Sequence, residues 1–181
     1  MRVLLIGLRG AGKTFVGEAL AERLHLPWID TDQWIAANHS SPSKIIREAG
    51  IAALRRAEVT AVRSLSASRR GVISLGGGAV ESREVIDLLQ GWSSFWLDAP
   101  DEELVRRIQS DLVDRPPLTG ATSPLEEMAQ LRERRTPLYR EFSPVMISTV
   151  AREGSQLSRP RDRGEIVDEI VGFMTGEAAT E

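Results

Sequence analysis

Residues 7–14 read GLRGAGKT and match the pattern G-x-x-x-x-G-K-S/T, whose residue types and spacing suit phosphate chemistry. Glycines in such a loop let consecutive backbone N–H groups point inward around phosphate oxygens. Lys13 would reach the β- and γ-phosphates of a nucleotide, and the Thr14 hydroxyl would bind Mg²⁺. A strand before the loop and a helix after it disfavour the alternative, a glycine-rich turn beside an ordinary helix. The motif, a P-loop, predicts ATP-binding residues at Gly10, Ala11, Gly12, Lys13 and Thr14.

Two carboxylates, Asp30 and Asp32, follow the short apolar stretch of residues 26–29. Carboxylates two positions apart can serve different partners. Asp30 could hold Mg²⁺ through water, and Asp32 could accept a hydroxyl hydrogen from an acceptor molecule. Helix capping is the alternative, because Thr31 or Asp32 could simply cap the next helix. The pair alone leaves both interpretations open.

Three consecutive glycines, Gly76, Gly77 and Gly78, end the apolar run GVISL at residues 71–75. A run of glycines is costly in chain entropy, and it is tolerated where the backbone approaches a ligand or turns sharply. The glycines therefore indicate a segment whose backbone approaches a ligand, with a plain tight turn as the alternative.

Arginine dominates the basic residues, because the 23 lysines and arginines include only two lysines, Lys13 and Lys44. A chain this poor in lysine still places one in the P-loop. Because arginine is so common in this chain, the mere presence of one does not indicate a functional site, and its position must be used instead. Arg55, Arg115 and Arg135 are the positions of interest, although each one alone is compatible with a solvated surface charge.

The elements that must position these residues alternate between strands and helices. Strands are expected at residues 2–6, 26–29, 71–75, 93–97 and 145–148, and helices at residues 13–24, 31–37, 42–64, 82–89, 100–108, 124–139 and 164–174. Helix breaks are expected near residues 38–43 and near Gly50. This alternation predicts a parallel sheet covered on both faces, with ligands beyond the carboxyl ends of the strands. The three motifs follow the first three strands.

The composition suits one domain, with 41% apolar residues among 181. A net charge of −3 argues against nucleic-acid binding, and the sequence contains no apolar run typical of a membrane span or signal peptide. Without cysteine the chain has no disulfide or thiolate chemistry, and its two histidines are too few for a histidine-based metal site. We expect a cytoplasmic monomer without nucleic-acid or membrane partners.

Six motifs in order resemble the shikimate kinase family along nearly the whole chain. They are GLRGAGKT, DTD at residues 30–32, the helix with Gly50, Leu54, Arg55 and Glu58, SLGGGAV, RPPL at residues 115–118, and RTPLY at residues 135–139. The resemblance implies an α/β fold, a three-layer P-loop sandwich with a five-stranded parallel sheet in the order 2-3-1-4-5. It also implies one kinase domain at residues 1–175 with a mobile lid at about residues 110–124. We expect residues 176–181 to be a disordered tail.

The resemblance further implies roles residue by residue. Lys13 matches the phosphate lysine, Asp32 the acidic residue on the shikimate hydroxyls and candidate base, and Arg115 the lid arginine that approaches the transferred phosphate. These three would be the catalytic residues. Thr14 and, through water, Asp30 match the Mg²⁺ site, so the phosphate donor would be ATP with Mg²⁺.

On the acceptor side, Arg55 and Arg135 match the pair that binds the shikimate carboxylate. Glu58 matches the acidic residue that helps hold Arg55. The backbone expected to contact shikimate belongs to Gly76, Gly77 and Gly78.

Arg107 and Arg161 fall near positions that the family uses around adenine, so both are expected among the ATP-binding residues. The chain also departs from the common pattern. Ile51 and Leu54 stand where many members have glutamate and phenylalanine, and Arg163 stands where a proline often follows the adenine loop.

The implied reaction is transfer of the γ-phosphate of ATP to the 3-hydroxyl of shikimate, giving ADP and shikimate 3-phosphate. Without the resemblance, the same motifs support only a P-loop kinase of a small hydroxylated acceptor. A gluconate-type sugar-acid kinase shares the P-loop and an acid clamp, but would not be expected to carry the SLGGG and RPPL stretches together. A non-catalytic nucleotide-binding regulator on the same scaffold is the third interpretation, which the altered acceptor-side helix keeps open.

Overall fold

The computed structural model describes residues 1–68, 70–110, 116–153 and 156–176. The central sheet contains β1 (Arg2–Ile6), β2 (Trp28–Asp30), β3 (Gly71–Ser74), β4 (Ser93–Asp98) and β5 (Val145–Ser148). The helices are α1 (Lys13–Leu24), α2 (Thr31–Asn38), α3 (Pro42–Ser66), the 3-10 helix η1 (Ala79–Glu81), α4 (Arg83–Leu88), α5 (Asp101–Ser110), α6 (Pro124–Phe142) and α7 (Arg163–Thr175). A separate antiparallel pair consists of β6 (Val150–Glu153) and β7 (Gln156–Pro160).

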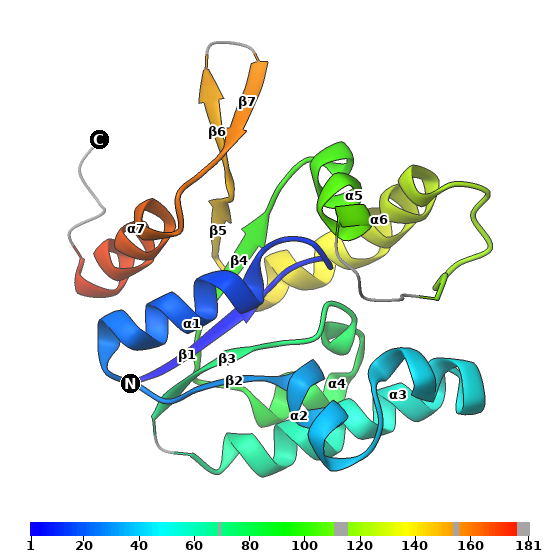
Figure 1. The fold of residues 1–181 in the computed structure, drawn as a ribbon. Helices are drawn as coiled ribbons and strands as arrows, with labels where there is room; N and C mark the ends of the chain where they lie inside the picture. Colours follow the sequence, from blue (N-terminus) through cyan, green and yellow to red (C-terminus); the bar gives the residue numbers. More distant parts are fainter. Residues whose placement is uncertain (69, 111–115, 154–155, 177–181) are drawn as a thin grey trace.

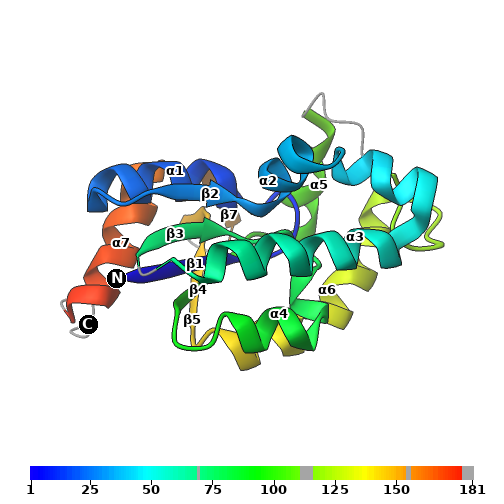
Figure 2. The same ribbon diagram turned by 90° about the horizontal axis from the view of Figure 1, so that it is seen from below.

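The central sheet is parallel throughout, in the order β2-β3-β1-β4-β5, which confirms the predicted order. Helices α1 and α7 cover one face, and α3, α4 and α6 lie on the other face (Figure 1 and Figure 2). Because parallel strands end at the same edge, the segments that follow β1, β2 and β3 come together there. These segments are the P-loop, the Asp30–Asp32 pair and the glycine run.

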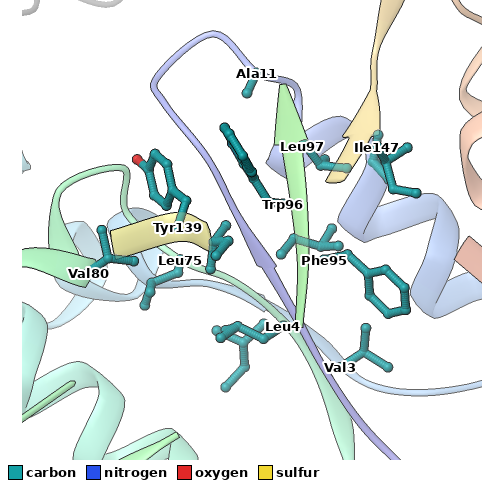
Figure 3. Close-up of a cluster of buried hydrophobic side chains, with 14 of the residues drawn as sticks. Val3, Leu4, Ala11, Leu75, Val80, Phe95, Trp96, Leu97, Tyr139 and Ile147 are labelled. Atoms are coloured by element: carbon teal, nitrogen blue, oxygen red, sulfur yellow. The ribbon is translucent and has the colours of Figure 1, made fainter. Parts of the chain in front are cut away.

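Burial on both faces of the sheet explains the near-continuous apolar runs of its strands. The last four residues of β1 are at most 1% exposed. Figure 3 shows the centre of this core, where Trp96 of β4 lies beside Tyr139 of α6. The two rings stack with their centroids 5.6 Å apart. This packing fixes α6 against the sheet near its carboxyl edge.

Two local features differ in how well the sequence predicted them. The predicted break near Gly50 is confirmed, because this residue has φ 79° and ψ 171° and kinks α3. The hairpin β6–β7, which projects from the sandwich in Figure 1, was not predicted.

Residues 111–115 of the predicted lid and residues 177–181 of the predicted tail lie outside the described residues. Within the described ranges, no helix combines the length and the apolar character that a membrane crossing needs.

Candidate active site

The P-loop connects β1 to α1, and its last residue before the helix has a backbone conformation that only glycine adopts readily. Gly12, the N-cap of α1, has a left-handed backbone with φ 89°, and no side chain in the described part of the chain caps its helix. The first amides of α1 therefore face the loop as donors, an arrangement that suits an anion. Lys13 lies across the same loop, because its ammonium group donates to the carbonyl oxygens of Gly7 and Leu8 at 2.9 Å each.

Asp30 joins the P-loop to the second strand. The Thr14 hydroxyl donates to one carboxylate oxygen of Asp30 at 2.6 Å. The other oxygen accepts from the backbone N–H groups of Asp32 at 2.9 Å and Gln33 at 3.3 Å. Asp30 is therefore the cap of α2, and the capping alternative for Thr31 or Asp32 was wrong. With Asp30 in this role, the side chain of Asp32 is exposed at the carboxyl edge of the sheet.

The glycine run packs between the P-loop and α3. Gly76 donates its N–H to the Thr31 hydroxyl at 2.8 Å, and Gly77 accepts from the Tyr139 hydroxyl at 2.6 Å. A β-carbon on Gly78 would lie 2.2 Å from a terminal nitrogen of Arg55, so a side chain there would displace the guanidinium. This close approach accounts for glycine at Gly78 better than a plain turn does.

Arg55 and Arg135, which come from α3 and α6, meet at one carboxylate. Arg55 donates through Nη1 to both oxygens of Glu58, at 3.0 and 2.7 Å, and through Nη2 to Glu81 at 2.6 Å. Arg135 donates through Nε to Glu81 at 2.9 Å, and Arg134 donates to the same oxygen at 2.7 Å. The structure thus brings together two of the three arginines that the sequence singled out, with Glu81 between them.

The burial of this cluster has electrostatic consequences. Arg135 is 1% exposed, and its Nη2 has no hydrogen-bond partner among the described residues. Burial raises the pKa of Glu58 to about 7, against the lowering effect of Arg55, and the nearby charge of Asp32 adds to the rise. Burial acts in the same direction on Glu81, but its arginine partners outweigh it and hold the pKa of Glu81 below its usual value.

The predicted adenine-side arginines lie beyond β5. Arg107 donates to the Gly10 carbonyl oxygen at 3.2 Å and to the Thr149 hydroxyl at 2.9 Å. Arg161 donates to the Ser148 carbonyl oxygen at 2.9 Å. Arg107 is therefore directly linked to the P-loop. Arg161 instead contacts the end of β5. The predicted lid residue Arg115 lies outside the described residues.

Comparison with known proteins assigns this arrangement to a family. A family model for shikimate kinase matches residues 9–175 of the chain. The chain belongs to the shikimate kinase family. The matched region contains the P-loop from its third residue onward, the glycine run and both arginines of the cluster.

Individual members of the shikimate kinase family agree over most of their length. The shikimate kinase of Symbiobacterium thermophilum is 35% identical over 174 residues, which cover 91% of this chain and 99% of that protein. The shikimate kinase of Syntrophus aciditrophicus is 38% identical over 183 residues, covering 93% and 88% respectively. A structure of Acinetobacter baumannii shikimate kinase in complex with shikimate superposes with a TM-score of 0.83, at 26% identity over 98% of this chain and 94% of that chain.

Two parts of the site in this member of the shikimate kinase family were not predicted. Glu81 lies 26 positions from Arg55 and 54 from Arg135, so no local pattern connects it with either. Glu127 of α6 contacts Arg9 of the P-loop and accepts from the backbone N–H of Leu118. Both acidic residues act through contacts between distant segments, and only the position of Glu81, three residues after the glycine run, offered a signal.

Proposed function

We propose that this chain transfers the γ-phosphate of ATP to the 3-hydroxyl of shikimate, giving ADP and shikimate 3-phosphate. The observation that carries the proposal is the position of an arginine pair, one member buried and the other half-buried, beside a P-loop. Arg55 and Arg135 converge on one carboxylate; in the glycine run beside them, Gly77 approaches the P-loop backbone and Gly78 approaches Arg55. A P-loop binds the donor, and a paired guanidinium site recognises an acceptor that carries a carboxylate.

On the donor side, we assign the phosphates to Lys13 and to the backbone of Gly10, Ala11, Gly12 and Thr14. The Thr14 hydroxyl and the Asp30 carboxylate present hard oxygen donors 2.6 Å apart, which fits Mg²⁺ held directly by Thr14 and through water by Asp30. Bound Mg²⁺ would neutralise charge on the β- and γ-phosphates. The Lys13 ammonium would exchange its two loop carbonyls for phosphate oxygens.

On the acceptor side, we assign the hydroxyl to Asp32 and the carboxylate to Arg55 and Arg135. The position of a β-carbon on Gly76 would lie 2.7 Å from Asp32 and 3.1 Å from Glu58, so both carboxylates border this glycine. Gly76 and its two following glycines would present backbone to the acceptor. Because phosphoryl transfer depends mainly on position and charge compensation, Asp32 would orient the hydroxyl and receive its proton.

The remaining assignments complete the picture of a single kinase domain over residues 1–175. We propose that Arg115, on a lid of about residues 110–124, approaches the γ-phosphoryl group, and that Arg107 and Arg161 lie near adenine. Arg107 is supported by its hydrogen bond to the Gly10 carbonyl oxygen. We also propose that the enzyme acts as a cytoplasmic monomer.

A coupled ADP-release assay tests the proposal and separates it from the alternatives. We expect ATP turnover that depends on shikimate and is absent with gluconate or without an acceptor. Turnover with gluconate instead would favour the sugar-acid kinase. ATP binding without turnover on either acceptor would favour the non-catalytic regulator.

A further inference from the structure

Glu81 occupies the place between the two arginines where an acceptor carboxylate would be expected. Its Oε2 accepts from Nη2 of Arg55 at 2.6 Å, and its Oε1 accepts from Nε of Arg135 at 2.9 Å. A carboxylate that takes one donor from each of two guanidinium groups has the geometry of a bound carboxylate ligand. Here the ligand is part of the chain itself.

Glu81 occupies hydrogen-bond donors of the two arginines that an acceptor carboxylate would use. Glu58 already holds Nη1 of Arg55, so Glu81 takes the other terminal nitrogen. On Arg135, Nη2 is buried and has no hydrogen-bond partner in the described part of the chain. A buried guanidinium nitrogen without a partner is costly and marks a position that a ligand oxygen can fill.

We propose that Glu81 is an internal competitor, which holds the Arg55–Arg135 pair until the acceptor carboxylate displaces it toward Arg134. The inference rests on the proposed function, because it concerns the same arginine pair. Removal of a competitor should raise the affinity for the acceptor. Removal of a residue that merely orients the arginines should lower it.

The surroundings of Glu81 permit this displacement. Its side chain is 21% exposed, so it is in part open to solvent, and it ends the three-residue helix η1. Arg134 donates to Oε1 of Glu81 at 2.7 Å, and its own side chain is 52% exposed. Glu81 can therefore keep one cationic partner at the surface after it releases the two arginines that lie deeper.

The experiment compares shikimate affinity in Glu81→Gln and in the unmodified enzyme, by isothermal titration and by KM at saturating ATP. Glutamine removes the competing charge, so we expect shikimate to bind on the order of ten-fold more tightly, as loss of a charge-assisted interaction predicts. The KM for ATP should not change. Glu84→Gln is the matched control, because Glu84 is a neighbouring acid whose ion pair with Arg63 is exposed. It should leave both affinities unchanged.

Two further measurements identify the carboxylate as the group in competition. An analogue with an alcohol in place of the shikimate carboxylate should gain no affinity from Glu81→Gln. Arg134→Gln removes the surface partner of Glu81 and should weaken shikimate binding several-fold, and this loss should disappear when Glu81→Gln is also present. The opposite response of these two variants distinguishes competition from a loss of folding, which would weaken binding in both.

Each result decides a specific point. Shikimate affinity that falls or stays constant in Glu81→Gln overturns the competitor role, even if shikimate is phosphorylated normally. A gain that extends equally to the analogue overturns it as well. If the unmodified enzyme neither binds nor phosphorylates shikimate, the proposed function fails, and the inference fails with it.

Discussion

Replacement of Arg135 by lysine perturbs the acceptor site while it keeps the charge. The Arg135 side chain is 1% exposed and donates through Nε to Glu81 at 2.9 Å, while its buried Nη2 has no hydrogen-bond partner among the described residues. A planar guanidinium can bind a carboxylate through two parallel hydrogen bonds, and an ammonium group cannot reproduce them. A lysine at this position therefore loses at least one charge-assisted bond to the acceptor.

The lost hydrogen bond sets the scale of the expected loss of shikimate affinity. A charge-assisted hydrogen bond contributes about 1.5–3 kcal/mol, which corresponds to a ten- to hundred-fold change in affinity. We expect Arg135→Lys to raise the KM for shikimate by this factor and to leave the KM for ATP nearly unchanged. The coupled ADP-release assay, with shikimate varied at saturating ATP, measures both constants.

The neighbouring arginine supplies the control. Arg134 contacts the same carboxylate of Glu81, but its side chain is 52% exposed, and lysine at this position keeps the positive charge that pairs with Glu81. Arg134→Lys should change the KM for shikimate by less than about three-fold. If Arg135→Lys uses shikimate normally, or loses ATP affinity to the same extent, the assignment of Arg135 to the acceptor carboxylate is refuted.

Three other changes test separate parts of the site. Lys13→Ala should abolish phosphoryl transfer with little change in the thermal unfolding midpoint, because a helix start tolerates alanine. Asp32→Asn should lower kcat by about a hundred-fold or more without weakening ATP binding, since a base or orienting carboxylate typically contributes this much. Because the pKa of Glu58 is raised to about 7, the folded state keeps a proton that the unfolded state loses above about 4.5. The stability of the parent relative to Glu58→Gln should therefore fall as pH rises from about 5 to 7, by at most about 3 kcal/mol in chemical denaturation.

These tests have matched controls and clear contrary outcomes. Lys44, the other lysine, pairs weakly with Glu48 at the surface, so Lys44→Ala should retain activity. Near-normal turnover of Lys13→Ala would contradict the P-loop assignment. An equal loss of ATP binding in Asp32→Asn would place Asp32 at the metal instead. A stability difference that stays constant across this pH range would show that Glu58 is ionised throughout.

The sequence was sufficient for the strands because their signals are local, whereas the order of the strands in the sheet was implied by the family resemblance. Short apolar runs predicted the strands, the first and third of them followed by glycine, and the helix over residues 13–24 agrees with α1 as observed. The unpredicted hairpin β6–β7 is formed by segments with a high share of polar residues, which carry no clear strand pattern.

The site was predictable where chemistry is confined to a short motif, and less so where it depends on long-range contacts. The P-loop was recognised by its spacing and by the strand and helix that flank it, whereas the choice of Asp30 as helix cap depended on which carboxylate faces the first amides of α2. Arg55 and Arg135 became informative only through the family resemblance. The position of Glu81 between them could not be inferred, because it requires α3, η1 and α6 to meet.

The position of the transferred phosphate is the most direct test of the central claim. ATP and shikimate would be incubated with the enzyme, and the product would be examined by phosphorus NMR with coupling to the ring protons. The proposed site predicts a single phosphate monoester on the 3-hydroxyl, formed together with an equal amount of ADP. Phosphate on another hydroxyl, release of inorganic phosphate alone, or the absence of any transfer would contradict it.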